Sequence, residues 1–474
     1  MEEEIYFPDT DLDLSFTSTV TDRTFASSSG RSSLTLSFND RLSTSSAVTT
    51  SSTSSSTINH RRQDPHWSAI KSAKLLSSDG NIHLRHLKLI RHLGTGNLGR
   101  VFLCNLRDPS ARFALKVIDR NNLTTAKKLS QVETEAEILS LLDHPFLPTL
   151  HARIDESHYT CLLIDYAPNG DLHSLLRKQP GNRLPLQPVR FFAAEVLVAL
   201  EYLHAMGIVY RDLKPENVLL REDGHVMLSD FDLCFKSDVV PTFKSRRYRR
   251  TSSSRSGCFS AAPAEEKYER EEIVSEFTAE PVTAFSRSCV GTHEYLAPEL
   301  VSGNGHGSGV DWWAFGIFLY ELLYGTTPFK GDSKEQTLRN IVSTTKTVRF
   351  HVDSDLDEAR DLIEKLLVKD PKKRLGCARG AQDIKRHPFF DGIKWPLIRH
   401  YKPPEEVRGL VIKKSTRAHA GHVTAVTPRR RKSFLWRALS YILRGKSSSG
   451  GSKNQSNSNY YHYVGKSYAS RKRV

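Results

Sequence analysis

Residues 210–217 read YRDLKPEN, and SDFD follows at residues 229–232. Four further short patterns surround this stretch: GTGNLGRV at 94–101, GTHEYLAPE at 291–299, DWW at 311–313 and DPKKRLG at 370–376. A chance occurrence of all six in this order is negligible. These patterns therefore decide the fold of the chain, and the remaining sequence is interpreted around them.

The first of these patterns is a glycine-rich turn between two apolar segments. Alone it is a weak signal, because a dinucleotide-binding turn looks similar. A dinucleotide site needs a helix after the glycines, whereas here another strand follows, FALKVI at 113–118, as in a flap that lies over phosphates. Lys116 lies in that strand, and a buried lysine needs a partner, for which Glu135 is the candidate. The alternative is a lysine that extends from a strand edge into solvent.

Strands are predicted early in the chain and helices late. Apolar residues on both sides of the glycine turn predict a β-hairpin, and residues 131–144 repeat apolar positions at helical spacing. Two long buried helices are predicted at 188–207 and 308–325, each closed by a glycine. This order predicts an α+β fold of two lobes, a β-rich N-lobe (87–165) and a helical C-lobe (166–390).

Three segments depart from this pattern. Residues 1–80 contain a long Ser/Thr run and are predicted to be a disordered, phosphorylatable arm. Residues 236–285 form an insert in which basic residues come first and acidic residues follow; a loop of that length is usually functional or disordered. Residues 391–474 are a C-terminal extension that ends in a basic tail.

The composition excludes several classes of protein. The six cysteines contain no C-x-x-C pair, which argues against a disulfide scaffold or zinc finger and favours a reducing compartment. The N-terminus is acidic, unlike a secretory signal. No apolar run reaches the roughly 18 residues of a membrane span. We expect an intracellular chain that does not span a membrane.

The six patterns together resemble the protein kinase fold from Leu87 to about Phe390. HPFLPTL at 144–150, Tyr210 in place of the usual histidine, and KDPKKRLG at 369–376 resemble the AGC group. Asp232 in place of a glycine, with the long insert, is similar to the plant AGC VIII kinases. The DLDLSFTSTVTDRTF arm, the basic insert and the YYHYVGK and SRKRV end resemble the PINOID/WAG branch, closest to the WAG kinases.

The resemblance implies a serine/threonine protein kinase that binds ATP and Mg²⁺ between its lobes. Asp212 would accept the proton of the substrate hydroxyl, Lys214 would neutralise the transferring phosphoryl group, and Asn217 and Asp230 would hold the metal ions. The residues expected at ATP are Gly94, Thr95, Gly96, Asn97, Leu98, Gly99, Val101, Lys116, Glu135, Asp165 and Ala167. Two structural roles are also implied: Glu299 would pair with Arg374, and Asp311 would brace the catalytic loop.

The rival class is a pseudokinase scaffold that acts through its basic tail and insert. Pseudokinases usually lose the lysine or one of the two aspartates, and this sequence keeps Lys116, Asp212, Asn217 and Asp230. Asp232 is the irregular position. Aspartate tolerates positive φ less well than glycine, which predicts a bias toward the state with Phe231 buried; the alternative is a neutral marker of the lineage.

Carboxylates and serines indicate the substrate preference and the regulation. Asp171, Glu216 and Glu321 align with positions where AGC kinases bind arginines, so Arg-directed phosphorylation is expected; each alone is otherwise a solvated surface acid. Ser288, with Ser286 as a second candidate, occupies the position where a phosphate can pair with an arginine and order the activation segment. The resemblance also implies that the substrates are hydrophilic loops of auxin efflux carriers, which would make the chain a regulator of polar auxin transport.

The net charge of +15 is concentrated in the tail, because residues 405–474 carry sixteen Lys/Arg and two acidic residues. An apolar stripe there predicts a helix that lies on an anionic membrane or binds a calmodulin-like protein; the alternative is packing on the kinase lobe. We expect a monomer at the cytoplasmic face of the plasma membrane and in the cytoplasm, with the nucleus as a further location. No nucleic-acid motif is present. The residues predicted for this helix are Phe434, Leu435, Trp436, Leu439, Ile442 and Leu443, with Trp436 as an interfacial aromatic beside the apolar stripe.

Overall fold

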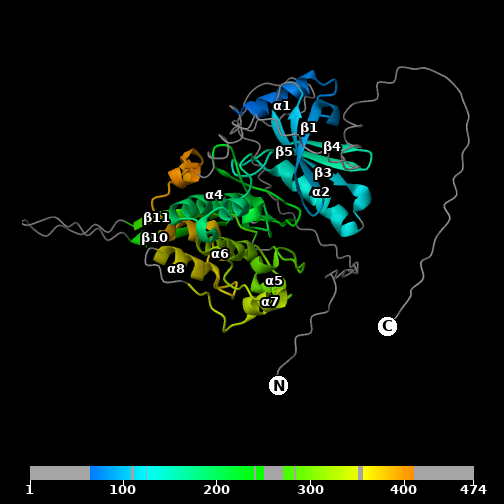
Figure 1. The fold of residues 1–474 in the computed structure, drawn as a ribbon. Helices are drawn as coiled ribbons and strands as arrows, with labels where there is room; N and C mark the ends of the chain where they lie inside the picture. Colours follow the sequence, from blue (N-terminus) through cyan, green and yellow to red (C-terminus); the bar gives the residue numbers. More distant parts are fainter. Residues whose placement is uncertain are drawn as a thin grey trace, which may run out of the picture. The chain divides into compact units, whose positions relative to one another are not determined.

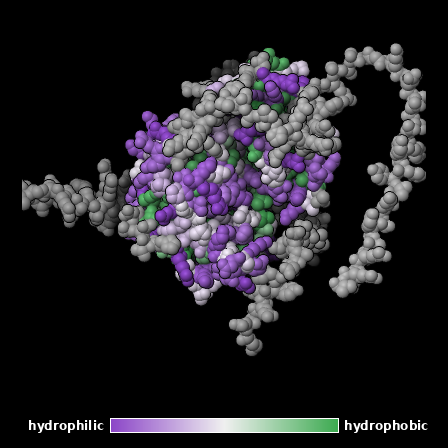
Figure 2. All heavy atoms as spheres, viewed as in Figure 1, coloured by the Kyte–Doolittle hydropathy of each residue, from purple (hydrophilic) through white to green (hydrophobic). Residues whose placement is uncertain are grey.

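The structure, a computed structural model, describes residues 64–107, 111–123, 125–239, 242–249, 271–281, 284–350 and 356–409. Most of the predicted N-terminal arm lies outside these residues, as does the predicted tail helix at 434–443. Within the described residues, no helix has the length and apolar character that crossing a bilayer requires. Figure 2 shows mainly hydrophilic residues over the described surface on the face in view, with small hydrophobic patches between them.

The N-lobe is built on a five-stranded antiparallel sheet in the order β1-β2-β3-β5-β4. The predicted hairpin is present, since β1 and β2 pair from Leu87 opposite Leu106 to Thr95 opposite Arg100. The predicted third strand is β3, whose side chains are buried except at its ends. The strands are β1 (Leu87–Thr95), β2 (Arg100–Leu106), β3 (Arg112–Asp119), β4 (Leu150–Glu156) and β5 (Tyr159–Asp165).

A helix at the start of the described chain corrects the prediction that the arm continues to residue 80. Helix α1 (Pro65–Leu76) begins at Asp64, whose side chain accepts a hydrogen bond from the His66 backbone N–H. Proline is favoured at the first helical position. The helix buries Ile70 and two alanines in an apolar cluster with residues of the β-sheet, and Figure 1 shows it beside β1. Residues 65–76 therefore belong to the folded N-lobe.

The remaining α-helices of the described residues lie in the C-lobe, apart from α2 (Ala126–Leu141), which connects β3 to β4. The two predicted long helices are α4 (Leu186–Ala205) and α6 (Gly309–Tyr324), which lie side by side (Figure 1). Most residues of both helices are buried, and Gly207 and Gly325 follow them with positive φ as predicted. The shorter ones are α3 (Leu172–Leu176), α5 (Pro298–Val301), α7 (Lys334–Val342), α8 (Asp357–Leu366) and α9 (Ala381–Lys385).

Two pairs of short strands follow α4 in the C-lobe. β6 (Ile208–Val209) pairs with β9 (Phe235–Lys236), and β7 (Val218–Leu220) pairs with β8 (Val226–Leu228). The sequence does not predict the conformation of the insert, and two of its segments form a strand pair. β10 (Thr242–Arg249) pairs antiparallel with β11 (Glu271–Thr278), so that the basic half of the insert lies opposite the acidic half.

The start of the predicted C-terminal extension packs on the C-lobe. Ile398 and Val407 are buried in its core, and Pro403 lies against Gly224. Residues 391–409 therefore continue the folded domain.

Candidate active site

The glycine-rich turn covers one side of a cavity of about 450 Å³ between the lobes. Gly94, Thr95 and Gly96 line this cavity together with Val101. Gly96 donates its backbone N–H to the Gly99 carbonyl at 2.9 Å. A Cβ atom at Gly99 would come within 2.4 Å of the Val117 carbonyl oxygen, so only glycine lets the turn approach β3 this closely.

Three of the predicted turn residues, Asn97, Leu98 and Gly99, do not line the cavity. Leu98 is buried in the apolar core beside Ile118. Asn97 donates its amide N–H to the Asp232 carboxylate at 3.2 Å. The turn thus contributes a cradle of backbone groups and small residues, and Asn97 connects it to the SDFD segment.

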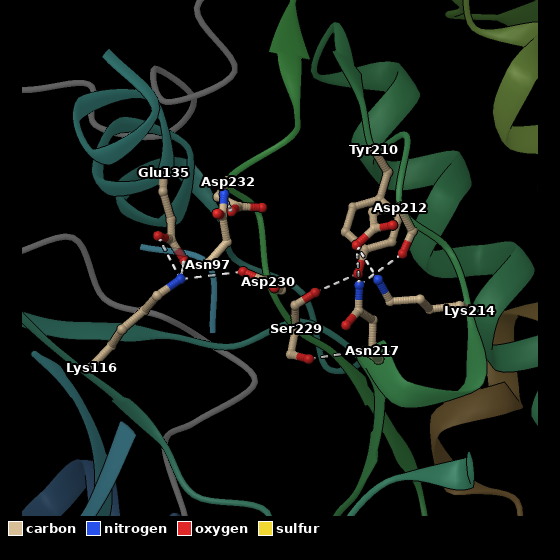
Figure 3. Close-up of polar contacts among 10 residues, drawn as sticks. All are labelled: Asn97, Lys116, Glu135, Tyr210, Asp212, Lys214, Asn217, Ser229, Asp230 and Asp232. Carbon is tan, nitrogen blue, oxygen red and sulfur yellow. Dashed lines mark hydrogen bonds and ion pairs between the residues drawn. The ribbon is translucent and has the colours of Figure 1, made fainter. Parts of the chain in front are cut away.

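Lys116 forms the predicted ion pair with Glu135 of α2. Its Nζ atom lies 2.5 and 2.7 Å from the two carboxylate oxygens and 3.2 Å from Asp230 Oδ1 (Figure 3). Burial alone would lower the pKa of Lys116, but attraction to Glu135 and Asp230 raises it above its ordinary value. The site therefore contains a buried ammonium group that is held between two carboxylates at the edge of the cavity.

Three polar side chains surround Asp212, two from the catalytic loop and one from the segment at 291–299. Lys214 Nζ donates to Asp212 Oδ2 at 2.7 Å, and Asn217 donates to the carbonyl and to Oδ2 of Asp212, both at 2.8 Å (Figure 3). Thr292 adds a contact that the sequence did not predict: its hydroxyl donates to Asp212 Oδ1 at 3.2 Å and accepts from Lys214 at 2.9 Å. Asp212 is thus oriented from both of its oxygens.

Asp311 holds the strained backbone of Arg211 in the catalytic loop. Arg211 and Asp230 have positive φ values of 66° and 60°, which cost free energy for residues other than glycine. Asp311 accepts backbone hydrogen bonds from Tyr210 at 2.8 Å and from Arg211 at 2.7 Å. The predicted brace on the catalytic loop is therefore present.

Phe231 lies in the buried state that the sequence favours. It is 1% exposed and contacts the Tyr210 ring, with the ring centroids 5.5 Å apart. Asp232 is 3% exposed and does not have positive φ. Burial and the neighbouring Asp230 raise the pKa of the Asp232 carboxyl. The hydrogen bond from Asn97 satisfies the Asp232 carboxylate, and the fold therefore accommodates an aspartate at this position.

The end of β5 and the residues that follow it form another wall of the cavity. Ile164, Asp165 and Ala167 line it. The Asp165 carboxylate accepts from the Thr149 backbone N–H at 3.1 Å and contacts His151 at 2.8 Å. Because these hydrogen bonds occupy the Asp165 side chain, the backbone groups of this segment are the ones available to bind a ligand.

The three predicted arginine-binding acids occupy different places. Asp171 caps α3 through the Ser174 backbone N–H at 2.6 Å and lines the large cavity. Glu216 lies 3.1 Å from His173, and Glu321 accepts a hydrogen bond from the Tyr295 hydroxyl. Burial raises the pKa of Glu321, and the nearby Glu216 adds to the rise.

Glu294 is an acidic residue that sequence reasoning missed. It lines a cavity of about 110 Å³ together with Glu321 and His173. Its carboxylate accepts from the Thr327 hydroxyl at 2.6 Å and lies 3.4 Å from Lys330. Glu294 could have been identified as a site residue because it lies two residues after Thr292, in the segment that contacts Asp212. Glu216, Glu294 and Glu321 are called the acidic cluster below.

The two candidate phosphorylation sites lie together at Arg211. The Arg211 guanidinium donates to Ser288 Oγ at 2.9 Å and to Ser286 Oγ at 3.4 Å.

Deeper in the C-lobe, the predicted Glu299–Arg374 pair is bidentate at 2.6 and 2.8 Å. This pair is buried and acts on the architecture of the lobe.

Comparison with known proteins identifies the family. The protein kinase domain model matches residues 87–250 and 274–390. The serine/threonine-protein kinase WAG2 of Arabidopsis thaliana is 92% identical over the full length of both chains, and WAG1 of the same plant is 75% identical over 98% of this chain and all of its own. Protein kinase PINOID 2 of Arabidopsis is 44% identical over 73% of this chain and 80% of its own length. The chain is therefore a serine/threonine protein kinase, which acts on protein substrates with ATP and a divalent metal, and it belongs to the plant PINOID/WAG branch of the AGC kinases.

Proposed function

We propose that this kinase uses Mg²⁺ with ATP to phosphorylate serine and threonine residues preceded by arginine. The observation that carries the proposal is the acidic cluster. Glu216 belongs to the same loop as Asp212, and Glu294 follows Thr292, which contacts Asp212. A peptide whose hydroxyl reaches Asp212 thus has carboxylates near it for its guanidinium groups, and charge-assisted pairs of this kind are strong and specific.

The residues of the large cavity fit a nucleoside triphosphate with a divalent ion. Its volume of about 450 Å³ lies in the range of small-molecule sites. It presents the glycine-rich turn, the ammonium group of Lys116 and the oxygen-bearing side chains of Asn217 and Asp230. Hard divalent cations prefer oxygen ligands, and Mg²⁺ usually binds through one or two carboxylates plus substrate phosphates.

The chain's own groups then perform the transfer. ATP with Mg²⁺ supplies the phosphoryl group and screens its charge when bound. Asp212 accepts the hydrogen of the substrate hydroxyl and orients its oxygen, because Lys214, Asn217 and Thr292 hold both carboxylate oxygens. Lys214, which bridges Asp212 and Thr292, places a positive charge where negative charge develops.

A peptide array tests the arginine preference. The wild-type chain should prefer peptides with arginine before the target serine, and Glu321→Gln should reduce the kcat/KM ratio between arginine and alanine peptides by roughly ten- to a hundredfold, the range for hydrogen bonds to charged groups. Glu133→Gln is the matched control, since Glu133 is a surface acid that pairs with Arg153 on the N-lobe. An array without an arginine preference contradicts the proposal.

We further propose that auxin efflux carriers are the physiological substrates and that Ser288, with Ser286, is the activating phosphorylation site. The first rests on family resemblance. The second is supported by Arg211, which already contacts both hydroxyls and is placed to pair with a phosphate. Phosphorylation of a carrier loop in vitro by wild-type chain but not by Ser288→Ala supports both; equal activity of the two chains contradicts the activation step.

For the basic tail we propose a peripheral site on the anionic inner face of the plasma membrane. Its support is the charge of residues 405–474 and the apolar stripe around Trp436 and Leu439. Co-sedimentation of the full chain with phosphatidylserine vesicles should weaken in the Trp436→Ala/Leu439→Ala variant. Equal sedimentation rules the stripe out as an anchor, and calcium-dependent binding to calmodulin instead points to the protein partner.

A further inference from the structure

Both ends of the insert attach to the same turn at the end of α4. On the outgoing side, β9 pairs with β6, and the Ser237 backbone N–H donates to the Gly207 carbonyl at 2.8 Å. On the returning side, Glu280 reaches His204 in the last turn of α4. The insert therefore leaves and rejoins the domain next to the base of the catalytic loop.

Glu280 is the first member of a buried polar chain. Its carboxylate lies 2.9 Å from His204 Nδ1, and His204 Nε2 lies 2.8 Å from Asp311 Oδ2. The three side chains are 8%, 0% and 0% exposed. Asp311 in turn accepts the backbone N–H groups of Tyr210 and Arg211, so hydrogen bonds run without a break from the insert to the residues before Asp212.

The fold contains a shaped place for the Glu280 side chain. Gly380 has a φ of +65°, and a Cβ atom there would overlap the Glu280 carboxylate. The following residues are docked as well: Ala284 is buried, and Ser286 exchanges backbone hydrogen bonds with His306 at 3.0 and 2.9 Å. The returning end of the insert is therefore anchored before it reaches Ser288.

Both ring nitrogens of His204 act as hydrogen-bond donors in this polar chain. An imidazole between two carboxylates satisfies both only when both of its nitrogens donate, that is, as the imidazolium ion. Burial alone would lower the pKa of His204, but Glu280 and Asp311 raise it to about 10. With His204 donating to Oδ2, the Asp311 carboxylate is held in the orientation that receives the two loop N–H groups.

We propose that Glu280 is a positioning residue for phosphoryl transfer. It acts through His204 and Asp311 on the main chain of Tyr210 and Arg211, and so on the placement of Asp212. The end of the insert is then part of the machinery that orders the catalytic loop. A residue that orients a reacting group affects the rate of transfer more than nucleotide binding.

Steady-state kinetics of full-length variants test this. Glu280→Ala should lower kcat roughly tenfold and leave KM for ATP within about twofold, since coupling of this kind is worth a factor of several to a hundred. Glu280→Gln should keep kcat within about threefold of wild type, because a carboxamide still reaches His204. Glu280→Asp keeps the charge but loses the reach, so its kcat should fall as in Glu280→Ala.

Two comparisons make the test specific. Phe285→Ala is the matched control: Phe285 lies over Gly305 in the same returning segment and is 62% exposed, so its removal loosens the segment away from His204 and should leave kcat near wild type. In a His204→Ala background, Glu280→Ala should have no further effect. An undiminished kcat in Glu280→Asp, an equal loss in Phe285→Ala, or additive losses in the double variant would each overturn the proposal; circular dichroism confirms that every variant is folded.

Discussion

Replacing Asp232 by glycine should ease the movement of Phe231 out of its buried position. In the structure, Phe231 is covered by Tyr210, and the buried Asp232 carboxylate accepts a hydrogen bond from Asn97 of the glycine-rich turn. The glycine variant loses this bond and gains access to positive φ. Both changes favour the state with Phe231 exposed.

The magnitude follows from these contributions. An L-residue in the left-handed region costs about 1–2 kcal/mol relative to glycine, with aspartate at the low end. The lost Asn97 bond contributes about 1 kcal/mol more. Relief of the repulsion between Asp230 and Asp232, seen in the raised pKa of Asp232, acts in the opposite direction. The net change of about 1.4 kcal/mol corresponds to roughly tenfold.

Titration calorimetry with an inhibitor that requires the exposed Phe231 measures this difference. Its affinity for Asp232→Gly should exceed that for wild type by roughly tenfold, whereas an inhibitor that accepts the buried state should bind both equally. Asn97→Ala removes the hydrogen bond alone and should give only part of the gain. Unchanged or weaker binding to Asp232→Gly refutes the reasoning and favours a neutral replacement of the glycine.

Three further perturbations test other parts of the structure. Glu299→Ala leaves Arg374 buried without its counter-charge. Thermal unfolding should show that the free energy of unfolding falls by about 3–5 kcal/mol. A smaller fall would mean that the ion pair is solvated. Ile70→Ala should lower the free energy of unfolding, measured by urea denaturation, by about 2–5 kcal/mol. An unchanged value would mean that α1 does not pack on the N-lobe. The pKa of His204 is about 10 in the folded protein against an ordinary 6.5. Protonated His204 therefore contributes fully to the free energy of unfolding below pH 6.5, and this contribution is lost as the pH rises through 10. The pH dependence over this window should flatten in Glu280→Gln.

The sequence predicted those parts of the molecule that depend on local patterns. The glycine turn, the strand of Lys116 and the two long helices all carry their signal within twenty residues. The Lys116–Glu135 pair was predicted because both residues belong to adjacent elements. Helix α1 was missed because the Ser/Thr-rich arm dominated the composition, although Asp64 before a proline was a helix start signal.

Contacts between distant segments were not accessible in this way. Glu280 meets His204 across 76 residues, and Glu294 approaches Glu321 only after α6 is packed. The hairpin of β10 and β11 was not predicted, because its strands are rich in charge and show little hydrophobic periodicity. Tertiary packing decides each of these, and a single sequence contains no periodicity that reports it.

The central claim is that this chain transfers phosphate rather than serving as a scaffold with a kinase fold. Autophosphorylation of the full-length wild type, compared with Asp230→Ala, tests it most directly, because Asp230 lines the cavity and contacts Lys116. We predict incorporation of labelled phosphate by the wild type and none by Asp230→Ala. A wild-type chain without transfer, or a variant with undiminished transfer, would contradict the account.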